Sequence, residues 1–166
     1  MEIRPARRAD AMAVAGVHVR SWQAAYRGLL PDDYLAGLRP EDRAARYGFE
    51  DPAQPTTLVA LDDSVVVGFA TVGPSQDADA SDHGELLALY VDPPAWGLGF
   101  GRHLMDAARG VLTDQGFASG LLWLLVGNQR AERFYRVDGW RPDGSRRREE
   151  IWGVEVDEVR FRRPLP

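Results

Sequence analysis

Three glycines at alternate positions, Gly97, Gly99 and Gly101, stand between an apolar run and a stretch with helical spacing, and Arg102 follows them directly. Where a strand turns into a helix, backbone without side chains exposes N–H groups at the positive end of the helix, and anions bind there. The arginine adds a cation beside these groups. The spacing therefore predicts a phosphate-binding turn, although glycines at such a junction can also serve only tight packing and positive φ angles.

Two familiar phosphate motifs do not fit these glycines. A dinucleotide-binding G-x-G-x-x-G read from Gly97 would need a glycine at Arg102, and read from Gly99 it would need one at Leu104. A Walker A loop needs a lysine, and the chain contains none, which also excludes Schiff-base catalysis. The chain has no cysteine either, so thiolate nucleophiles, disulfides and cysteine-ligated zinc are excluded.

The elements that must position this turn predict a mixed α/β domain that spans residues 1–166. Alternating or apolar runs indicate strands at about 2–6, 56–62, 64–73, 84–91 and 120–126, with two more after Trp140. Helical spacing indicates helices at about 8–26, in one or two short pieces within 28–49, and at 101–116 and 128–139. Because a helix connects the fourth strand to the fifth, these two strands should be parallel.

Three other segments carry weaker signals. The first helix would place an apolar stripe on one face, made of Met12, Ala15, Val19, Trp22 and Tyr26. The polar composition of residues 75–83 suggests a mobile loop rather than chemistry. The arginines at 146–148, followed by two glutamates, indicate a solvated face of a strand pair.

Composition and charge exclude several classes of function. With 166 residues, 45% of them hydrophobic, the chain suits one domain with a proper core. A net charge of -5 disfavours a nucleic-acid partner, because phosphate backbones bind to basic surfaces. The first residues contain no apolar signal-peptide core, and no apolar run reaches the roughly 20 residues of a membrane span. We therefore expect a cytoplasmic protein with no membrane partner.

The stretch from Trp96 to Gly101 and a segment after the fifth strand together resemble the GNAT superfamily of N-acetyltransferases. The acetyl-CoA motif of that family is Gln or Arg, two residues, Gly, one residue, and Gly or Ala, so Trp96 is the one departure. The downstream matches are Asn128, Ala131, Phe134, Tyr135 and Gly139. Residues 17–31 are similar to the first helix of one branch of bacterial members, so the resemblance covers nearly the whole chain.

The resemblance implies the GNAT fold, a mixed central sheet of about seven strands flanked by helices and splayed between the fourth and fifth strands. It also implies acetyl-CoA as cosubstrate, and we expect no metal. Pantetheine would pair with the fourth strand like an added strand, the pyrophosphate would bind the glycine turn, and Arg130 or Arg133 would reach the adenosine phosphates. The expected cofactor contacts are Leu89, Tyr90, Val91, Trp96, Gly97, Leu98, Gly99, Phe100, Gly101, Arg102, Asn128, Ala131 and Phe134.

Acetyl transfer to an amine needs a base, because an alkylamine with a pKa of about 10.4 is protonated near neutral pH. Glu85 begins the fourth strand, where carboxylates serve as bases in parts of the family, and it can equally be an exposed carboxylate without a role. His83 fits a solvated histidine better than a partner of Glu85. Tyr135 falls on the family position for the acid that protonates the leaving thiolate, and packing against Phe134 is its alternative.

The first helix of the family borders the acceptor pocket, which makes Trp22 and Tyr26 candidate substrate-binding residues, although both also fit core packing. His103 is expected at the surface or in packing. The predicted function is N-acetyl transfer by direct attack of a primary amine in a ternary complex, with the oxyanion held by backbone N–H near Val91. The acceptor would be a small molecule or a peptide, and a homodimer through sheet edges or C-terminal strands is open.

Two other functions fit the same residues. The first is a non-catalytic acyl-CoA sensor with the same fold. The second is a protein that binds nucleotide phosphates with the glycine turn alone. Asn128 and Tyr135 favour the enzyme over both.

Overall fold

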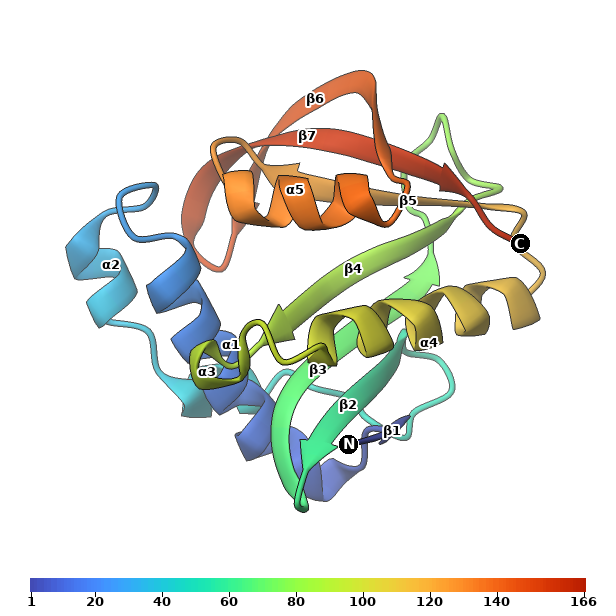
Figure 1. The fold of residues 1–166 in the computed structure, drawn as a ribbon. Helices are drawn as coiled ribbons and strands as arrows, with labels where there is room; N and C mark the ends of the chain where they lie inside the picture. Colours follow the sequence, from blue (N-terminus) through green and yellow to red (C-terminus); the bar gives the residue numbers. More distant parts are fainter.

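The computed structural model describes the whole chain, Met1 to Pro166, and its centre is a seven-stranded mixed sheet (Figure 1). The strands are β1 (Glu2–Pro5), β2 (Thr56–Asp62), β3 (Val65–Pro74), β4 (Gly84–Val91), β5 (Ser119–Leu125), β6 (Arg141–Ile151) and β7 (Val154–Pro164). Their order across the sheet is β1-β2-β3-β4-β5-β7-β6. The expected sheet of about seven strands is confirmed.

The sheet splays between β4 and β5. These strands are parallel, as predicted, and they pair only where Gly84 to Leu86 face Gly120 to Leu122. Beyond that point the two strands diverge, while β5 keeps pairing with β7 up to Leu125 (Figure 1). The second half of β4 therefore has no strand on the side that faces β5, as the family fold implies.

The helices are α1 (Ala11–Ala25), α2 (Asp32–Ala36), α3 (Pro40–Ala44), α4 (Phe100–Asp114) and α5 (Gln129–Val137). α1 and α4 cover opposite faces of the β1–β4 half of the sheet, α2 and α3 pack beside α1, and α5 lies against the β5–β7 half (Figure 1). Along β2, Leu58 and Ala60 belong to the core under α4, whereas Val59 and Leu61 belong to the core under α1. None of these helices has the length and apolar character that a membrane span requires.

The predicted first helix is confirmed, but its predicted apolar face is wrong at Met12, whose side chain is 52% exposed. The buried stripe starts at Val14 and continues through Val17 and His18 to Trp22. Steps of three or four residues back from Val14 reach the start of the helix without touching Met12, which therefore points to another side.

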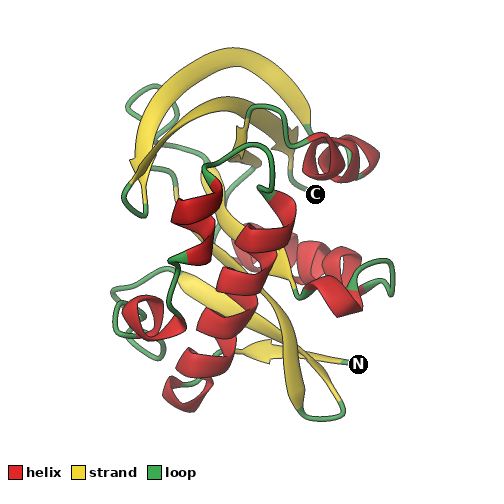
Figure 2. Cartoon of the chain, turned by 90° about the vertical axis from the view of Figure 1, so that its left-hand side faces the viewer, coloured by secondary structure: helices red, strands yellow, loops and turns green.

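The loop before β4 and the β6–β7 hairpin are tied to the rest of the fold. Arg160 of β7 binds Asp77 at 2.9 Å and Asp79 at 2.7 Å. These ion pairs hold the loop at 75–83 in place, which argues against the mobility expected for it. The β6–β7 hairpin forms an arch above α1 and α2 (Figure 2). Its turn packs against Trp22, Tyr26 and Leu35.

Candidate active site

A cavity of about 850 Å³ opens where β4 and β5 diverge. Its walls come from both strands, the turn before α4, α5, α1 and β7. Every predicted site residue lines it except Leu98, which is 62% exposed to solvent. The structure therefore brings the sequence candidates together in one space.

The glycine turn presents unpaired backbone to this cavity. Gly97 has φ 79° and Gly99, the residue before α4, has φ 92°, so both adopt the left-handed conformation that favours glycine. The N–H groups from Gly99 to Arg102 have no partner in the chain, because the first turn of a helix leaves its donors free. His103 is exposed and its Nδ1 lies 2.9 Å from the Gly99 carbonyl, a surface position as expected.

The free edge of β4 lies opposite this turn. Asp92 donates its N–H to Val67 of β3, so the backbone of Val91, one residue earlier, faces the cleft. The Val91 carbonyl accepts hydrogen bonds from Trp96 Nε1 at 2.6 Å and from Ser21 Oγ at 3.0 Å. Its oxygen is thus occupied, whereas its N–H and the backbone groups of Leu89 stay available for a ligand.

Trp96, the departure from the family motif, has two contacts of its own. Besides its bond to Val91, its ring lies under the guanidinium of Arg130, 3.4 Å from the ring centroid. Arg130 stands at the start of α5, so the stack crosses the cleft from one half of the sheet to the other. Burial lowers the pKa of Arg130 from its usual range.

The wall formed by α5 carries Asn128 and Tyr135. Asn128 caps the helix by accepting a hydrogen bond from the Ala131 N–H at 3.3 Å, so it has a structural reason to be present. Tyr135 is 9% exposed and its hydroxyl makes no hydrogen bond within the chain. Burial raises its pKa well above the usual value for tyrosine, so the phenol keeps its proton.

Glu85 is buried at the opposite end of the cavity, with 7% of its surface exposed. Burial raises its pKa to about 7, and the nearby Asp77 carboxylate adds to the rise while Arg147 opposes it. His83 does not line the cavity, and the solvated position expected for it is wrong. Its side chain is 15% exposed and its ring nitrogens face Asp82 at 2.8 Å and Arg162 at 3.2 Å.

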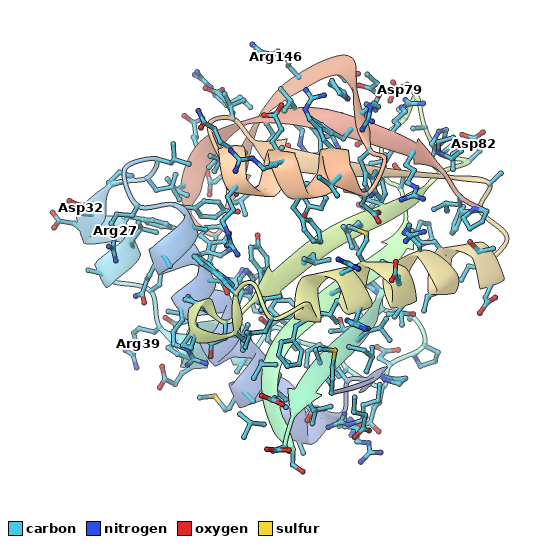
Figure 3. All side chains as sticks on the ribbon, viewed as in Figure 1. Arg27, Asp32, Arg39, Asp79, Asp82 and Arg146 are labelled. Atoms are coloured by element: carbon cyan, nitrogen blue, oxygen red, sulfur yellow. The ribbon has the colours of Figure 1, made fainter.

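The sequence missed Arg147 and Glu158. The run 146–148 was expected to be solvated, and Arg146 does point outward (Figure 3). Arg147, however, lines the cavity, where its Nε lies 2.9 Å from Glu158 Oε1 and its guanidinium lies 4.2 Å from the centroid of Trp123. The two-residue period of a strand places neighbouring arginines on opposite faces, and it could have found this position.

Trp22 and Tyr26 are 4% and 7% exposed and also line the cavity. Both residues therefore pack in the core and border the site. The Tyr26 and Tyr90 hydroxyls are 3.3 Å apart. His18, stacked on Tyr90, is held neutral, because burial and the charge of Arg43 lower its pKa to about 3.

Comparison with known proteins agrees with this geometry. Residues 20–140 match the family model described as Acetyltransferase (GNAT) family. The chain is 33% identical over 131 residues to the uncharacterized N-acetyltransferase YuaI of Bacillus subtilis, covering 76% of this chain and 72% of the relative. It is 30% identical over 141 residues to the uncharacterized N-acetyltransferase Rv2669 of Mycobacterium tuberculosis, covering 82% and 86%.

Two solved structures share the fold. PaiA N-acetyltransferase from Thermoplasma acidophilum, in complex with coenzyme A, superposes with a TM-score of 0.74 at 20% identity and 98% coverage of both chains. YncA from Salmonella typhimurium, with its cofactor acetyl-CoA, gives a TM-score of 0.74 at 21% identity, covering 100% of this chain and 94% of YncA.

Proposed function

Because the chain belongs to the GNAT family of acetyltransferases and is an acyltransferase, we propose that it moves an acetyl group from acetyl-CoA to a primary amine, by direct attack within a ternary complex. One observation carries the proposal. A single cavity joins the free amides of the turn before α4, the unpaired edge of β4 and the buried Glu85. The ligands of PaiA and YncA support acetyl-CoA as the donor.

The residues of the chain fit this donor, which supplies an acetyl group already activated as a thioester. The free N–H groups from Gly99 to Arg102 would hold the pyrophosphate at the positive end of α4. The N–H groups of Leu89 and Val91 would pair with the pantetheine and hold the oxyanion. Arg130 and Arg133, which line the same wall, would bind the adenosine phosphates.

Glu85 would act as the general base, through water where the amine lies out of direct reach. A base with a pKa of about 7 is half ionised at neutral pH and still accepts a proton. As the nitrogen–carbon bond forms and the carbon–sulfur bond breaks, the amine proton passes to Glu85.

Tyr135 would donate a hydrogen bond to the departing thiolate. Its raised pKa lies above the pKa of about 8.5 that is usual for a thiol, so the phenol stabilises the sulfur while solvent completes the protonation. Its free hydroxyl supports this role.

An acceptor screen that follows the release of free CoA from acetyl-CoA tests the function. We expect saturable turnover with a subset of primary amines, and initial-rate lines that intersect when both substrates are varied. Parallel lines would indicate an acetylated enzyme and would contradict the ternary complex. Acetyl-CoA binding without CoA release for any amine would favour the sensor. Saturable binding of NAD and ATP but not of acetyl-CoA would favour the nucleotide-phosphate function.

A further inference from the structure

Arg43 in α3 lines the cavity next to α1, on the side where the acceptor would bind, and forms no salt bridge. Its Nε donates to His18 Nδ1 at 3.3 Å, and its guanidinium lies 5.0 Å from the ring centroid of Trp152. The other groups that feel its charge are the phenols of Tyr34, Tyr47 and Tyr90. Phenols and a neutral imidazole do not balance a cation, so the charge of Arg43 has no counter-ion in the chain.

The other arginines of the cavity differ from Arg43. Arg147 is paired with Glu158 at 2.9 Å, so its charge is matched. Arg102, Arg130 and Arg133 stand on the opposite side, beside the glycine turn and α5. A half-buried cation without a partner costs free energy. The counter-ion of Arg43 is therefore expected from a ligand on the acceptor side.

A second donor without an acceptor lies close to Arg43. Trp22 Nε1 is fully buried, has no hydrogen-bond partner, and belongs to a side chain that is 4% exposed and lines the cavity. The ring of Trp152 lies 5.0 Å from the ring of Trp22 and 5.0 Å from the guanidinium of Arg43, so both donors border the same part of the cavity. Buried donors in folded proteins are almost always paired, so an acceptor oxygen is missing here.

Trp152 packs over this group of donors. It has φ 52° and is followed by Gly153 at φ 80°, so a bulky side chain occupies a turn position that favours asparagine or glycine. Its ring packs 5.0 Å from the centroids of both His18 and Trp22, and Tyr34 donates to its carbonyl at 2.5 Å. These contacts hold the strained turn over Arg43.

We propose that the acceptor is a primary amine that also carries an oxyanion, as an amino acid does, and that Arg43 and Trp22 Nε1 bind the oxyanion beneath Trp152. The inference rests on the proposed acetyl transfer and narrows its substrate class. Glu85 and Tyr90 share the face of β4 opposite α4, and His18, which stacks on Tyr90, accepts a hydrogen bond from Arg43. The pocket therefore has an acidic end at Glu85 and a basic end at Arg43. A zwitterion matches both ends, whereas a polyamine would place a second cation against Arg43.

Matched pairs of acceptors test the proposal: each amino acid against the amine left by its decarboxylation, such as phenylalanine against phenethylamine, with aminoalkylphosphonates as a third arm. The measurement is kcat/KM from CoA release. We expect the anionic member of the best pair to be preferred by about tenfold or more, as for a charge-assisted contact. If the phosphonate has a higher kcat/KM than the carboxylate, the site prefers a tetrahedral oxyanion to a planar one.

Arg43→Ala should abolish this preference by raising KM for the anionic acceptor, while the Kd of acetyl-CoA stays unchanged. Arg43→Lys should restore part of it, since the charge returns without the fork of donors. Arg46→Ala is the matched control, because Arg46 is exposed and lies outside the cavity. Equal or better turnover of the decarboxylated amines, or a preference that survives in Arg43→Ala, would overturn the oxyanion site and leave acetyl transfer standing.

Binding without turnover separates this inference from the function. Tryptophan fluorescence, to which Trp22 and Trp152 contribute two of the five indoles of the chain, would be titrated with the same amino acids and amines. Saturable binding of an amino acid to the wild type but not to Arg43→Ala would support the oxyanion site even if no CoA were released. Indifference of both proteins to every anionic member would refute it.

Discussion

At the scale of single residues, the most informative side chain is Glu85, a carboxylate that burial brings to a pKa of about 7. A base must be ionised to act, so activity should fall as the pH falls through about 7. Glu85→Gln keeps the shape of the side chain and should lower kcat/KM by about 10²-fold or more and remove that acid limb. Glu149→Gln, on an exposed residue of β6, is the control. An unchanged pH profile in Glu85→Gln would exclude Glu85 as the base.

The same carboxyl predicts an effect on stability with its own sign. Its pKa in the folded protein lies above the usual value of 4.5, so folding favours the protonated form and stability is lost as the pH rises from about 4.5 to 7. Glu85→Gln should therefore raise Tm more at pH 8 than at pH 5. Thermal unfolding at both values measures this difference, and an equal change at both would show that burial does not raise the pKa.

Tyr135 separates chemistry from binding. Tyr135→Phe removes only a hydroxyl that has no partner in the chain, so folding and acetyl-CoA affinity should be kept. Turnover should fall by about 10²-fold if the phenol assists the departing thiolate. Single-turnover rates and acetyl-CoA titrations would be compared, and unchanged turnover would remove Tyr135 from the mechanism.

At the scale of elements, the glycine turn before α4 can be tested against a glycine of equal strain. Gly97 and Gly116 have φ 79° and 91°, and an added Cβ would meet no atom within 4 Å at either. Alanine at each should cost about 1–2 kcal/mol of stability, because L-residues resist the left-handed conformation. Only Gly97→Ala should weaken acetyl-CoA binding, since only Gly97 lines the cavity. Equal affinities in the two variants would favour the packing explanation of these glycines.

At the scale of the whole molecule, Arg160 joins the loop before β4 to the β6–β7 hairpin. Its side chain is 4% exposed and binds Asp77, Asp79 and Asp143 at 2.9, 2.7 and 2.7 Å. Arg160→Leu leaves these carboxylates facing one another and should lower the unfolding free energy by about 3 kcal/mol at neutral pH. Arg148→Leu, which breaks an exposed pair with Asp157, should leave the unfolding free energy nearly unchanged.

The cost of Arg160→Leu should depend on pH. Hydrogen bonds from Arg160 lower the pKa of Asp79 to about 2 from 3.8, so its contribution is present above about pH 4 and is lost as the pH falls toward 2. Urea unfolding at pH 7 and pH 3 should show a smaller difference between wild type and variant at the lower pH. A difference that is the same at both would mean that packing of the side chain, rather than its charge, carries the stability.

Much of this fold follows from local patterns. The sequence predicted the strand β2, the glycine turn before α4 and the parallel pairing of β4 with β5. The motif residues line one cavity, as the resemblance implied. The prediction that Met12 is buried was wrong, because helical spacing alone does not determine which of two adjacent stripes of the helix faces the sheet. The position of Arg147 could have been predicted from the two-residue period of a strand. The contact between Arg43 and Trp152 could not, because it forms only when a short helix and a distant hairpin turn pack over α1.

The splay has a last consequence for β4, which is the fourth of seven strands in chain and sheet order yet ends as an edge strand. An edge normally lies at the rim of a sheet, where its amides exchange with solvent and can recruit another strand. Here the edge lies inside the molecule, and the N–H groups of Leu89 and Val91 wait for a ligand to act as the missing strand. Hydrogen exchange at these two central amides therefore reports whether the cleft is filled.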